Sequence, residues 1–141
     1  MNAKIPSWLD SSAIMTLLCG EPGTETVRDL LDKAERKTLI VLVSTVSLTE
    51  VVAAVARVHG QEAARDDLRL LLDLPVQFVP PSADDCAAAG WLRAQYKLST
   101  ADAIIAAQAM AAGAELVHKD PELAAVQGLK QRRLPYKPAK R

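Results

Sequence analysis

Hydrophobic and polar positions along the chain follow two periods, a short one typical of strands and a longer one typical of helices. The strands are predicted from four short apolar stretches, at residues 5–10, 38–44, 76–79 and 114–118. The second stretch, TLIVLVS, is apolar through its centre. A continuous apolar run of this length is expected for a parallel strand that is covered on both faces.

Between the predicted strands, apolar residues recur every three or four positions, as they do on one face of an amphipathic helix. In the second helical segment, Val27, Leu30 and Leu31 share such a face. The helices are predicted at residues 12–20, 22–37, 46–59, 61–73, 82–96 and 99–112. Strands that alternate with helices in this way predict an α/β sandwich with a mainly parallel sheet.

The length and composition fit a single domain that spans residues 1–141. Hydrophobic residues make up 50% of the chain and charged residues 24%, and no repeat or interdomain linker is visible. Two distant cysteines, Cys19 and Cys86, indicate neither a disulfide framework nor a zinc site. The most apolar window, residues 103–114, is too short to span a bilayer, and no secretory signal is visible. We therefore expect a cytoplasmic protein that makes no membrane contact.

Charge is distributed unevenly, although 17 basic and 17 acidic residues cancel over the whole chain. Residues 123–141 contain six basic residues and no acidic one, which leaves a net charge of −6 for the first 122. A basic tail over about residues 128–141 would contact the phosphate groups of a nucleic acid. The same pattern suits a solvated, flexible terminus, so charge alone does not decide between the two interpretations.

Four acidic residues stand where a parallel sheet would gather them at one edge. Asp10 ends the first predicted strand, and Asp120 follows the last one within two residues. Glu50 and Asp102 lie in the first turns of two predicted helices. Binding sites in parallel α/β sheets form in the crevice beyond the carboxyl ends of the strands. The four acids are therefore the candidate site.

Each acid taken singly also has a structural explanation. The spacing Ser99-x-x-Asp102 matches a capping box, in which the acid supports the start of a helix. Asp10 would cap the helix that follows it, and Asp120 would start a turn. Glu50 is harder to explain in this way, because its helix is otherwise largely apolar. Clustered carboxylates without Lys or Arg between them would repel one another, and a hard divalent cation would relieve that repulsion.

Four segments occur in the order LDSSAIM, STVSLTEVV, LSTADAIIAAQAM and LVHKDPEL. In this order they resemble the PIN-domain ribonucleases, in particular the VapC-type toxins of toxin–antitoxin pairs, and the third segment is the most specific. The resemblance implies a PIN-like three-layer sandwich, with a mainly parallel central sheet flanked by helices. It implies that the family's four acidic residues are Asp10, Glu50, Asp102 and Asp120, with Ser12 as a supporting hydroxyl and Glu122 as an auxiliary acid.

The resemblance further implies an endoribonuclease that hydrolyses RNA phosphodiester bonds with Mg²⁺ or Mn²⁺. The four acids would hold one or two ions, and the cut would leave a 3′-hydroxyl and a 5′-phosphate. Toxins of this type are expected to form homodimers and to bind a small antitoxin whose tail fills the acidic groove. A PIN module that works without an antitoxin, or that binds RNA or protein without cutting, stays open as the alternative.

One position departs from the family pattern, because His118 stands where Thr or Ser is usual. Its imidazole would either donate to a carboxylate or phosphate, as a hydroxyl does, or be satisfied by the backbone at the end of a strand. Arg93 and Lys97 precede Asp102 and are candidate RNA contacts. They equally suit the end of a helix, where the dipole favours cations.

Overall fold

A five-stranded sheet with the strand order β3-β2-β1-β4-β5 forms the centre of the computed structural model, which describes residues 4–136. All neighbouring strands run parallel. The mainly parallel sheet predicted from the sequence is therefore confirmed. The strands are β1 (Ser7–Leu9), β2 (Val41–Ser44), β3 (Gln77–Val79), β4 (Glu115–His118) and β5 (Gln131–Arg133).

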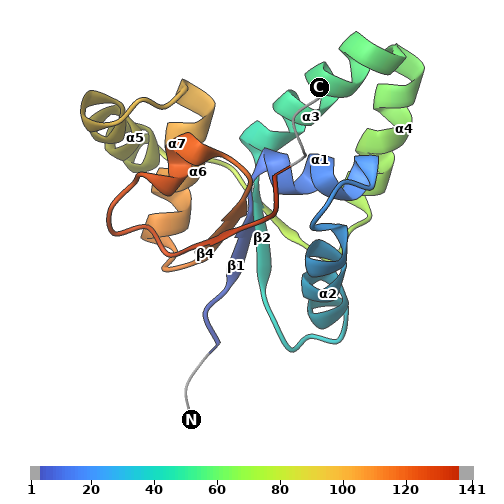
Figure 1. Cartoon of the computed structure of the whole chain (residues 1–141), viewed down its shortest axis with the longest axis horizontal. Coiled ribbons are helices and arrows are strands. Elements are labelled where there is room, and N and C mark those ends of the chain that lie inside the picture. The colour runs from blue at the N-terminus through green and yellow to red at the C-terminus, as the bar shows by residue number, and fades with distance from the viewer. Residues whose placement is uncertain (1–3, 137–141) are drawn as a thin grey trace.

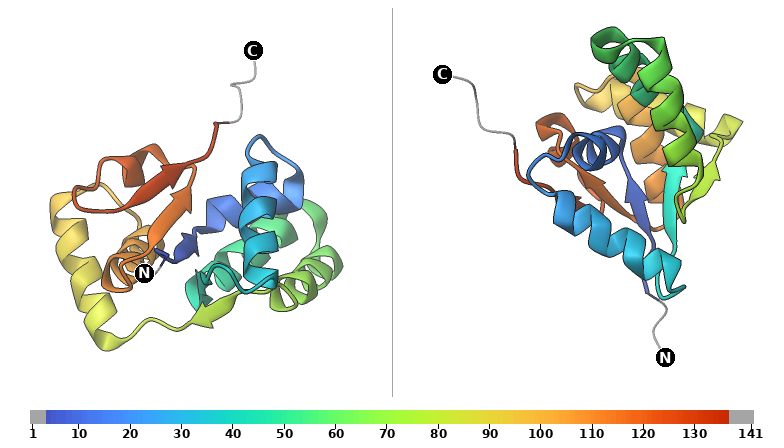
Figure 2. Two further views of the ribbon diagram at one scale, coloured as in Figure 1. Left: turned by 90° about the horizontal axis from the view of Figure 1, so that it is seen from below. Right: turned by 90° about the vertical axis from the view of Figure 1, so that its right-hand side faces the viewer.

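Helices cover both faces of the sheet, so the predicted three-layer arrangement is also confirmed (Figure 1). Figure 2 shows the same layers from two further directions. One layer contains α1 (Ser11–Cys19), α2 (Thr24–Glu35), α3 (Thr45–His59) and α4 (Gln61–Leu72). The other contains α5 (Ala83–Gln95), α6 (Thr100–Ala111) and α7 (Pro121–Ala124). No helix within residues 4–136 is both long enough and apolar enough to cross a membrane.

The sheet separates two hydrophobic cores, and successive strand residues alternate between them. Trp8 packs into the core under α5 and α6, whereas its neighbour Leu9 packs into the core under α1 to α4. Leu42 and Val43 divide in the same way on β2. Because side chains alternate along a strand and both faces are covered, the middle residues of β1, β2 and β4 are apolar, whereas the polar Ser7, Ser44 and His118 stand at strand ends. The uninterrupted apolar runs of the sequence have this origin.

Two short elements, α7 and β5, are not predicted by the hydrophobic pattern. Residues 131–133 are Gln, Arg and Arg, and they form an edge strand that pairs only with β4. Charged residues are typical of an edge strand because they discourage further pairing. Leu134, which follows β5, is buried and anchors this segment in the core. Residues 137–141 of the expected basic tail lie outside the described residues.

The order of the strands creates a switch point between β1 and β4. The chain passes from β1 to β2 and β3 on one side, and β4 and β5 are then added on the other side of β1. Connections on the two sides leave in opposite directions, which opens a crevice at the carboxyl ends of β1 and β4. Asp10 directly follows β1, and Asp120 lies two residues after β4.

Candidate active site

Asp10 lies at this switch point and is almost completely buried, with 3% of its surface exposed. Its backbone N–H donates to the carbonyl of Val117 over 3.0 Å, which fixes it against β4. One carboxylate oxygen, Oδ2, accepts hydrogen bonds from both the N–H and the hydroxyl of Ser12. The other oxygen, Oδ1, is buried without a hydrogen-bond partner among the described residues. A buried, unpaired carboxylate oxygen is unfavourable, and a bound cation would pair it.

Ser12 connects Asp10 to the end of β4. Its hydroxyl accepts a hydrogen bond from the backbone N–H of Lys119 over 3.0 Å while it donates to Asp10. The Lys119 ammonium donates to the carbonyl of Pro22 over 2.8 Å and lies 3.6 Å from a carboxylate oxygen of Glu21. The loop between α1 and α2 is thereby tied to the strand end that precedes Asp120.

Glu50 lies in the second turn of α3 and is held by a residue from α1. The Ser11 hydroxyl lies 2.6 Å from Glu50 Oε1 and 2.9 Å from the hydroxyl of Ser47, which is fully buried. Neither Ser11 nor Ser47 is among the sequence-predicted site residues. A signal for them exists, because Ser11 directly follows Asp10 and Ser47 precedes Glu50 by three residues on one helix face.

Asp102 shows how a capping pattern and a site residue differ. In α5, the Ser82-x-x-Asp85 spacing gives a complete capping box, since Asp85 accepts from the N–H of Ser82 over 2.9 Å. At α6, the Ser99 hydroxyl accepts from the N–H of Asp102 over 3.1 Å, but among the described hydrogen bonds the backbone N–H of Ser99 does not donate to the carboxylate of Asp102. The capping box at α6 is therefore incomplete, and the Asp102 carboxylate interacts instead with the side chain of Ser99 and with Asp120.

The pKa values of three of the acids are raised. Burial is the largest cause at Asp10, where the hydrogen bonds from Ser12 oppose it. Burial also raises the pKa of Glu50, with a smaller contribution from the charge of Asp10. Burial, the charge of Asp10 and the nearby carboxyl of Asp120 raise the pKa of Asp102 from 3.8 to about 7. Like charges in a partly buried site disfavour the ionised form of each acid.

We name Asp10, Glu50, Asp102 and Asp120 the acid cluster, because electrostatic interactions link Glu50 to Asp10, Asp10 to Asp102, and Asp102 to Asp120. None of the ion pairs within residues 4–136 involves these acids. No three His, Cys, Asp or Glu side chains in that range converge into a preformed metal site. The oxygen donors and the unpaired Oδ1 of Asp10 fit a hard divalent cation, around which the carboxylates would have to close.

Asp120 is positioned by its own loop and by His118. Asp120 Oδ1 accepts from the N–H of Glu122 over 2.9 Å at the start of α7. The backbone N–H of Asp120 donates to Nδ1 of His118 over 3.0 Å. The His118 ring is fully buried, and its Nε2 lies 2.7 Å from Oε1 of Gln131 in β5. Both ring nitrogens of His118 are thus bonded within the fold, as expected of a strand-end histidine satisfied by its surroundings.

The two basic residues that precede α6 have different environments. Arg93 Nε donates to the carbonyl of Leu98 over 3.1 Å, which joins the end of α5 to the loop before α6. Leu98 is buried, so Arg93 supports the position of this loop. The Lys97 side chain is 93% exposed, and its Nζ lies 4.0 Å from a carboxylate oxygen of Glu122. Lys97 therefore lies beside the loop that carries Asp120.

A cleft of about 480 Å³ opens beside the acid cluster, between α1 and α3. Ser11 and Glu50 line one end of it, and the exposed Arg57 lines the other. The small side chains of Ala53 and Ala54 keep the space between them open. The cleft therefore leads from an acidic end to a basic end along one helix.

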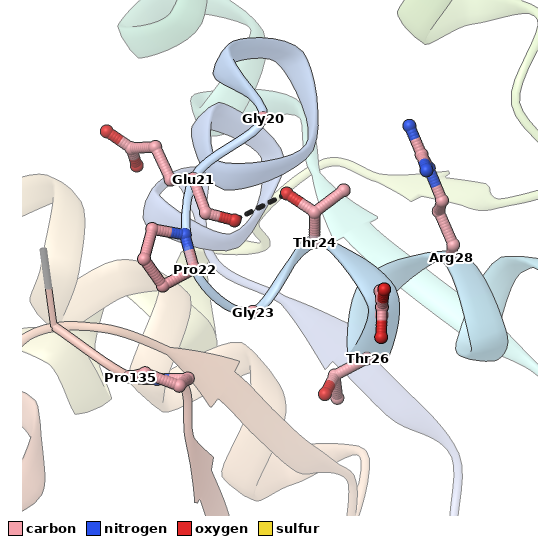
Figure 3. Close-up of a pocket in the computed structure, with 9 residues that line it drawn as sticks. Gly20, Glu21, Pro22, Gly23, Thr24, Thr26, Arg28 and Pro135 are labelled. Atoms are coloured by element: carbon pink, nitrogen blue, oxygen red, sulfur yellow. Dashed lines mark hydrogen bonds between the residues drawn. The ribbon is translucent and has the colours of Figure 1, made fainter.

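A cavity of about 600 Å³ lies elsewhere, at the loop between α1 and α2 (Figure 3). Figure 3 shows the Thr24 hydroxyl turned toward the carbonyl of Glu21, to which it donates over 2.6 Å. Pro135 contributes a further wall. The Thr24 hydroxyl stabilises the turn, and no member of the acid cluster lines this cavity. The candidate active site is therefore the acid cluster with its cleft of about 480 Å³, and not this larger cavity.

A family model of the PIN domain matches residues 8–129. Among curated proteins, no sequence matches the chain. The solved structure of VapBC2 from Rickettsia felis, bound to a DNA fragment from its promoter, has a TM-score of 0.76 at 19% identity, with 93% of this chain and 100% of that chain covered. VapC20 from Mycobacterium tuberculosis, a sarcin–ricin loop cleaving toxin, has a TM-score of 0.67 at 22% identity, with 84% and 92% covered.

A structure from Pyrobaculum aerophilum is also similar, with a TM-score of 0.66 at 20% identity and 92% of each chain covered. At identities this low, the likeness to these structures establishes a shared fold. The family model adds a match in sequence over residues 8–129, which is most of the chain. The chain therefore belongs to the PIN domain family.

Proposed function

We propose that the chain is a metal-dependent endoribonuclease that hydrolyses RNA phosphodiester bonds, and that it is the toxin of a toxin–antitoxin pair. The observation that carries this proposal is the acid cluster at the switch point between β1 and β4. Its carboxylates have no ion-pair partner among the described residues, and burial raises the pKa of three of them. An idle cluster of this kind would destabilise the fold, whereas a divalent cation uses the same oxygens as ligands.

We propose a separate role for each of the four acids. Asp10, with its unpaired Oδ1, is proposed as a ligand together with Asp102 and Asp120. Glu50 would orient the attacking water or hold a second ion. Mg²⁺ or Mn²⁺, when bound, supplies positive charge that activates this water and offsets the charge that develops on the phosphate. Ser12 would keep Asp10 in place through its hydroxyl.

The RNA strand is proposed to cross the acid cluster between two cationic side chains. Lys97 comes from the layer that contains α5 and α6, and Arg57 comes from α3 on the opposite face of the sheet (Figure 1). Both side chains are exposed. Contacts from Lys and Arg to phosphates position a nucleic acid without reading its sequence. Arg93 stays a weaker candidate, because its Nε is engaged with the Leu98 carbonyl.

Two partner proteins belong to the proposal. Structures of similar fold from Rickettsia felis and Salmonella typhimurium contain VapBC complexes, which supports a cognate antitoxin here. A basic segment of such a partner would neutralise the acid cluster and block access to it. A homodimer would also account for Trp91, whose side chain is 75% exposed on α5.

The alternative function is a PIN module that works without an antitoxin or binds RNA or protein without cutting it. This alternative predicts binding that does not depend on metal ions. The unpaired Asp10 oxygen and the raised pKa values favour catalysis, because a binding module does not need a buried acid cluster.

The proposal is tested by comparing the wild type with Asp102→Asn in Mn²⁺ and Mg²⁺, on a mixture of single-stranded and hairpin RNA oligonucleotides. Asp102→Asn should lose more than the roughly 10- to 100-fold in rate that is typical of residues that only support metal ligands. Asp85→Asn is the matched control, since Asp85 occupies the same position relative to its capping serine, away from the cluster. Metal-independent cleavage, or equal loss in both variants, would contradict the proposal.

A further inference from the structure

Glu50 differs from Asp10 and Asp120 in how its carboxylate is held. Asp10 is bonded by Ser12, and Asp120 by the N–H of Glu122, so each is fixed within two residues of its own position. Among the described residues, the side-chain hydrogen bond to Glu50 comes instead from Ser11, which lies on another helix. A glutamate has one more rotatable bond than an aspartate, so its carboxylate loses more freedom when it is fixed.

Ser11 is itself fixed by Ser47. A hydroxyl has one proton to donate, and an ionised carboxylate can only accept. The proton of Ser11 is therefore directed to Glu50 Oε1 over 2.6 Å, and the 2.9 Å contact with Ser47 uses the proton of Ser47. Ser47 is completely buried one turn before Glu50 on α3, where its hydroxyl has no access to water. Two consecutive hydrogen bonds therefore lead from Ser47 to Ser11 and from Ser11 to Glu50.

We propose that Ser11, supported by Ser47, is a positioning residue that holds Oε1 of Glu50 and leaves Oε2 to face a divalent cation in the acid cluster. This inference rests on the proposed function of the cluster. It assigns different tasks to two adjacent serines, because Ser12 holds Asp10 while Ser11 holds Glu50. The first turn of α1 thereby sets the relative positions of two acids from different elements.

Calorimetric titration with Mn²⁺ alone tests the inference without any substrate. Ser11→Ala should weaken Mn²⁺ affinity by roughly 10- to 100-fold, as expected for loss of a group that orients a metal ligand. Ser11→Thr keeps the hydroxyl in a cleft that has room for a methyl group, and it should restore affinity to within a few-fold of the wild type. Ser82→Ala, which removes the cap of α5, is the control for general destabilisation and should bind Mn²⁺ normally.

A double-mutant cycle shows whether Ser11 acts through Glu50. In the Glu50→Gln background, Ser11→Ala should weaken Mn²⁺ binding no further, because the carboxylate that it positions is absent. Ser11→Ala also leaves the buried Ser47 hydroxyl unpaired, which is unfavourable for folding. The double variant Ser11→Ala/Ser47→Ala removes both polar groups, should fold nearly as stably as the wild type, and should still bind Mn²⁺ weakly.

The possible results separate the inference from the proposed function. Normal Mn²⁺ affinity in Ser11→Ala, or additive effects of Ser11→Ala and Glu50→Gln, would overturn the inference and leave the proposed function intact. A wild-type protein that neither binds Mn²⁺ nor cleaves RNA would overturn the proposed function, and the inference with it. Weak binding in Ser11→Ala, rescue by Ser11→Thr and no further loss in the Glu50→Gln background would together support the inference.

Discussion

The backbone N–H of Asp120 donates to Nδ1 of His118 over 3.0 Å, so this ring nitrogen accepts a hydrogen bond and carries no proton. Nε2 then carries the proton and donates to Oε1 of Gln131, 2.7 Å away. The Nε2–H tautomer of His118 therefore joins the loop of Asp120, a candidate active-site acid, to the edge strand β5. Gln131 extends the link, since its amide nitrogen lies 3.4 Å from the carbonyl of Ala124 in α7.

We expect His118→Thr to separate stability from metal binding. A threonine leaves a cavity and removes the partner of Gln131, which should lower the free energy of unfolding by roughly 2–4 kcal/mol. Its hydroxyl can still accept from the N–H of Asp120, so Mn²⁺ affinity should change only a few-fold. His118→Leu fills the space but offers no acceptor to the N–H of Asp120, so it should lower both the free energy of unfolding and the Mn²⁺ affinity. Urea unfolding and calorimetry measure the two quantities, and equal stability of all three proteins would contradict this account.

The raised pKa of Asp102 makes the stability of the metal-free protein dependent on pH. The folded protein holds this proton up to a pH of about 7, whereas the ordinary pKa is 3.8. Protonation of Asp102 therefore contributes fully to the free energy of unfolding below about pH 4, and this contribution is lost as the pH rises through about 7. In EDTA, Asp102→Asn should be more stable than the wild type at pH 8 by roughly 1–2 kcal/mol, a value reduced to allow for partial exposure of the group.

Denaturant unfolding at pH 5, 6, 7 and 8 checks this prediction. The free energy of unfolding of the wild type should fall relative to that of Asp102→Asn over this range. Parallel pH profiles for the two proteins would show that Asp102 titrates as it does in the unfolded chain. Asp85→Asn serves again as the control, since Asp85 carries a carboxylate at the equivalent helix position in α5.

Ser12→Ala should affect metal binding and folding together. The substitution removes the donor to Asp10 Oδ2 and the acceptor of the Lys119 N–H, which lies next to the loop of Asp120. We expect a loss of about 1–3 kcal/mol in unfolding free energy from the unpaired groups, and roughly 10-fold weaker Mn²⁺ binding. Thermal unfolding and calorimetry would measure these changes. A variant that loses stability and keeps full Mn²⁺ affinity would limit Ser12 to a structural role.

The basic C-terminal residues are best tested by removing residues 137–141 only. A longer deletion would remove Leu134, which is buried, and could extend into β5. The short deletion takes away Lys137, Lys140 and Arg141. If all three contact phosphates, the slope of log affinity against log salt should decrease by about 2 for single-stranded RNA. Fluorescence anisotropy in the Asp102→Asn background measures this slope without cleavage, and an unchanged slope would show that these residues do not contact RNA.

The parts of the fold that the sequence predicts are those in which local pattern and burial agree. Residues 41–43 within the predicted strand at 38–44 are apolar because β2 is covered on both faces, and Gly20 ends α1 in a left-handed conformation that suits glycine. The strand β5 is different, because its residues are polar and it is held as a strand by pairing with β4 and not by a local hydrophobic pattern. Edge strands and one-turn helices such as α7 carry too little periodicity to be recognised.

The acids of the candidate site were predictable for a related reason. A parallel sheet brings its carboxyl ends to one edge, so acids that follow strands can be grouped from the order of elements alone. The residues that hold these acids in place were harder to predict from the sequence. Ser11 and Ser12 are adjacent serines, and only the packing of α1 against α3 shows that Ser11 reaches Glu50. The contact between His118 and Gln131 likewise depends on a strand that the pattern does not reveal.

The position of β1 between β2 and β4 determines when the acid cluster is complete during synthesis. Asp10 emerges early, but its neighbouring strand β4 and the acid Asp120 emerge only after most of the described chain. A nascent chain therefore carries Asp10, Glu50 and Asp102 before the last acid is available to join them. Under the proposed function, a growing chain that ends before Asp120 would lack one of the four acids and would not cleave RNA.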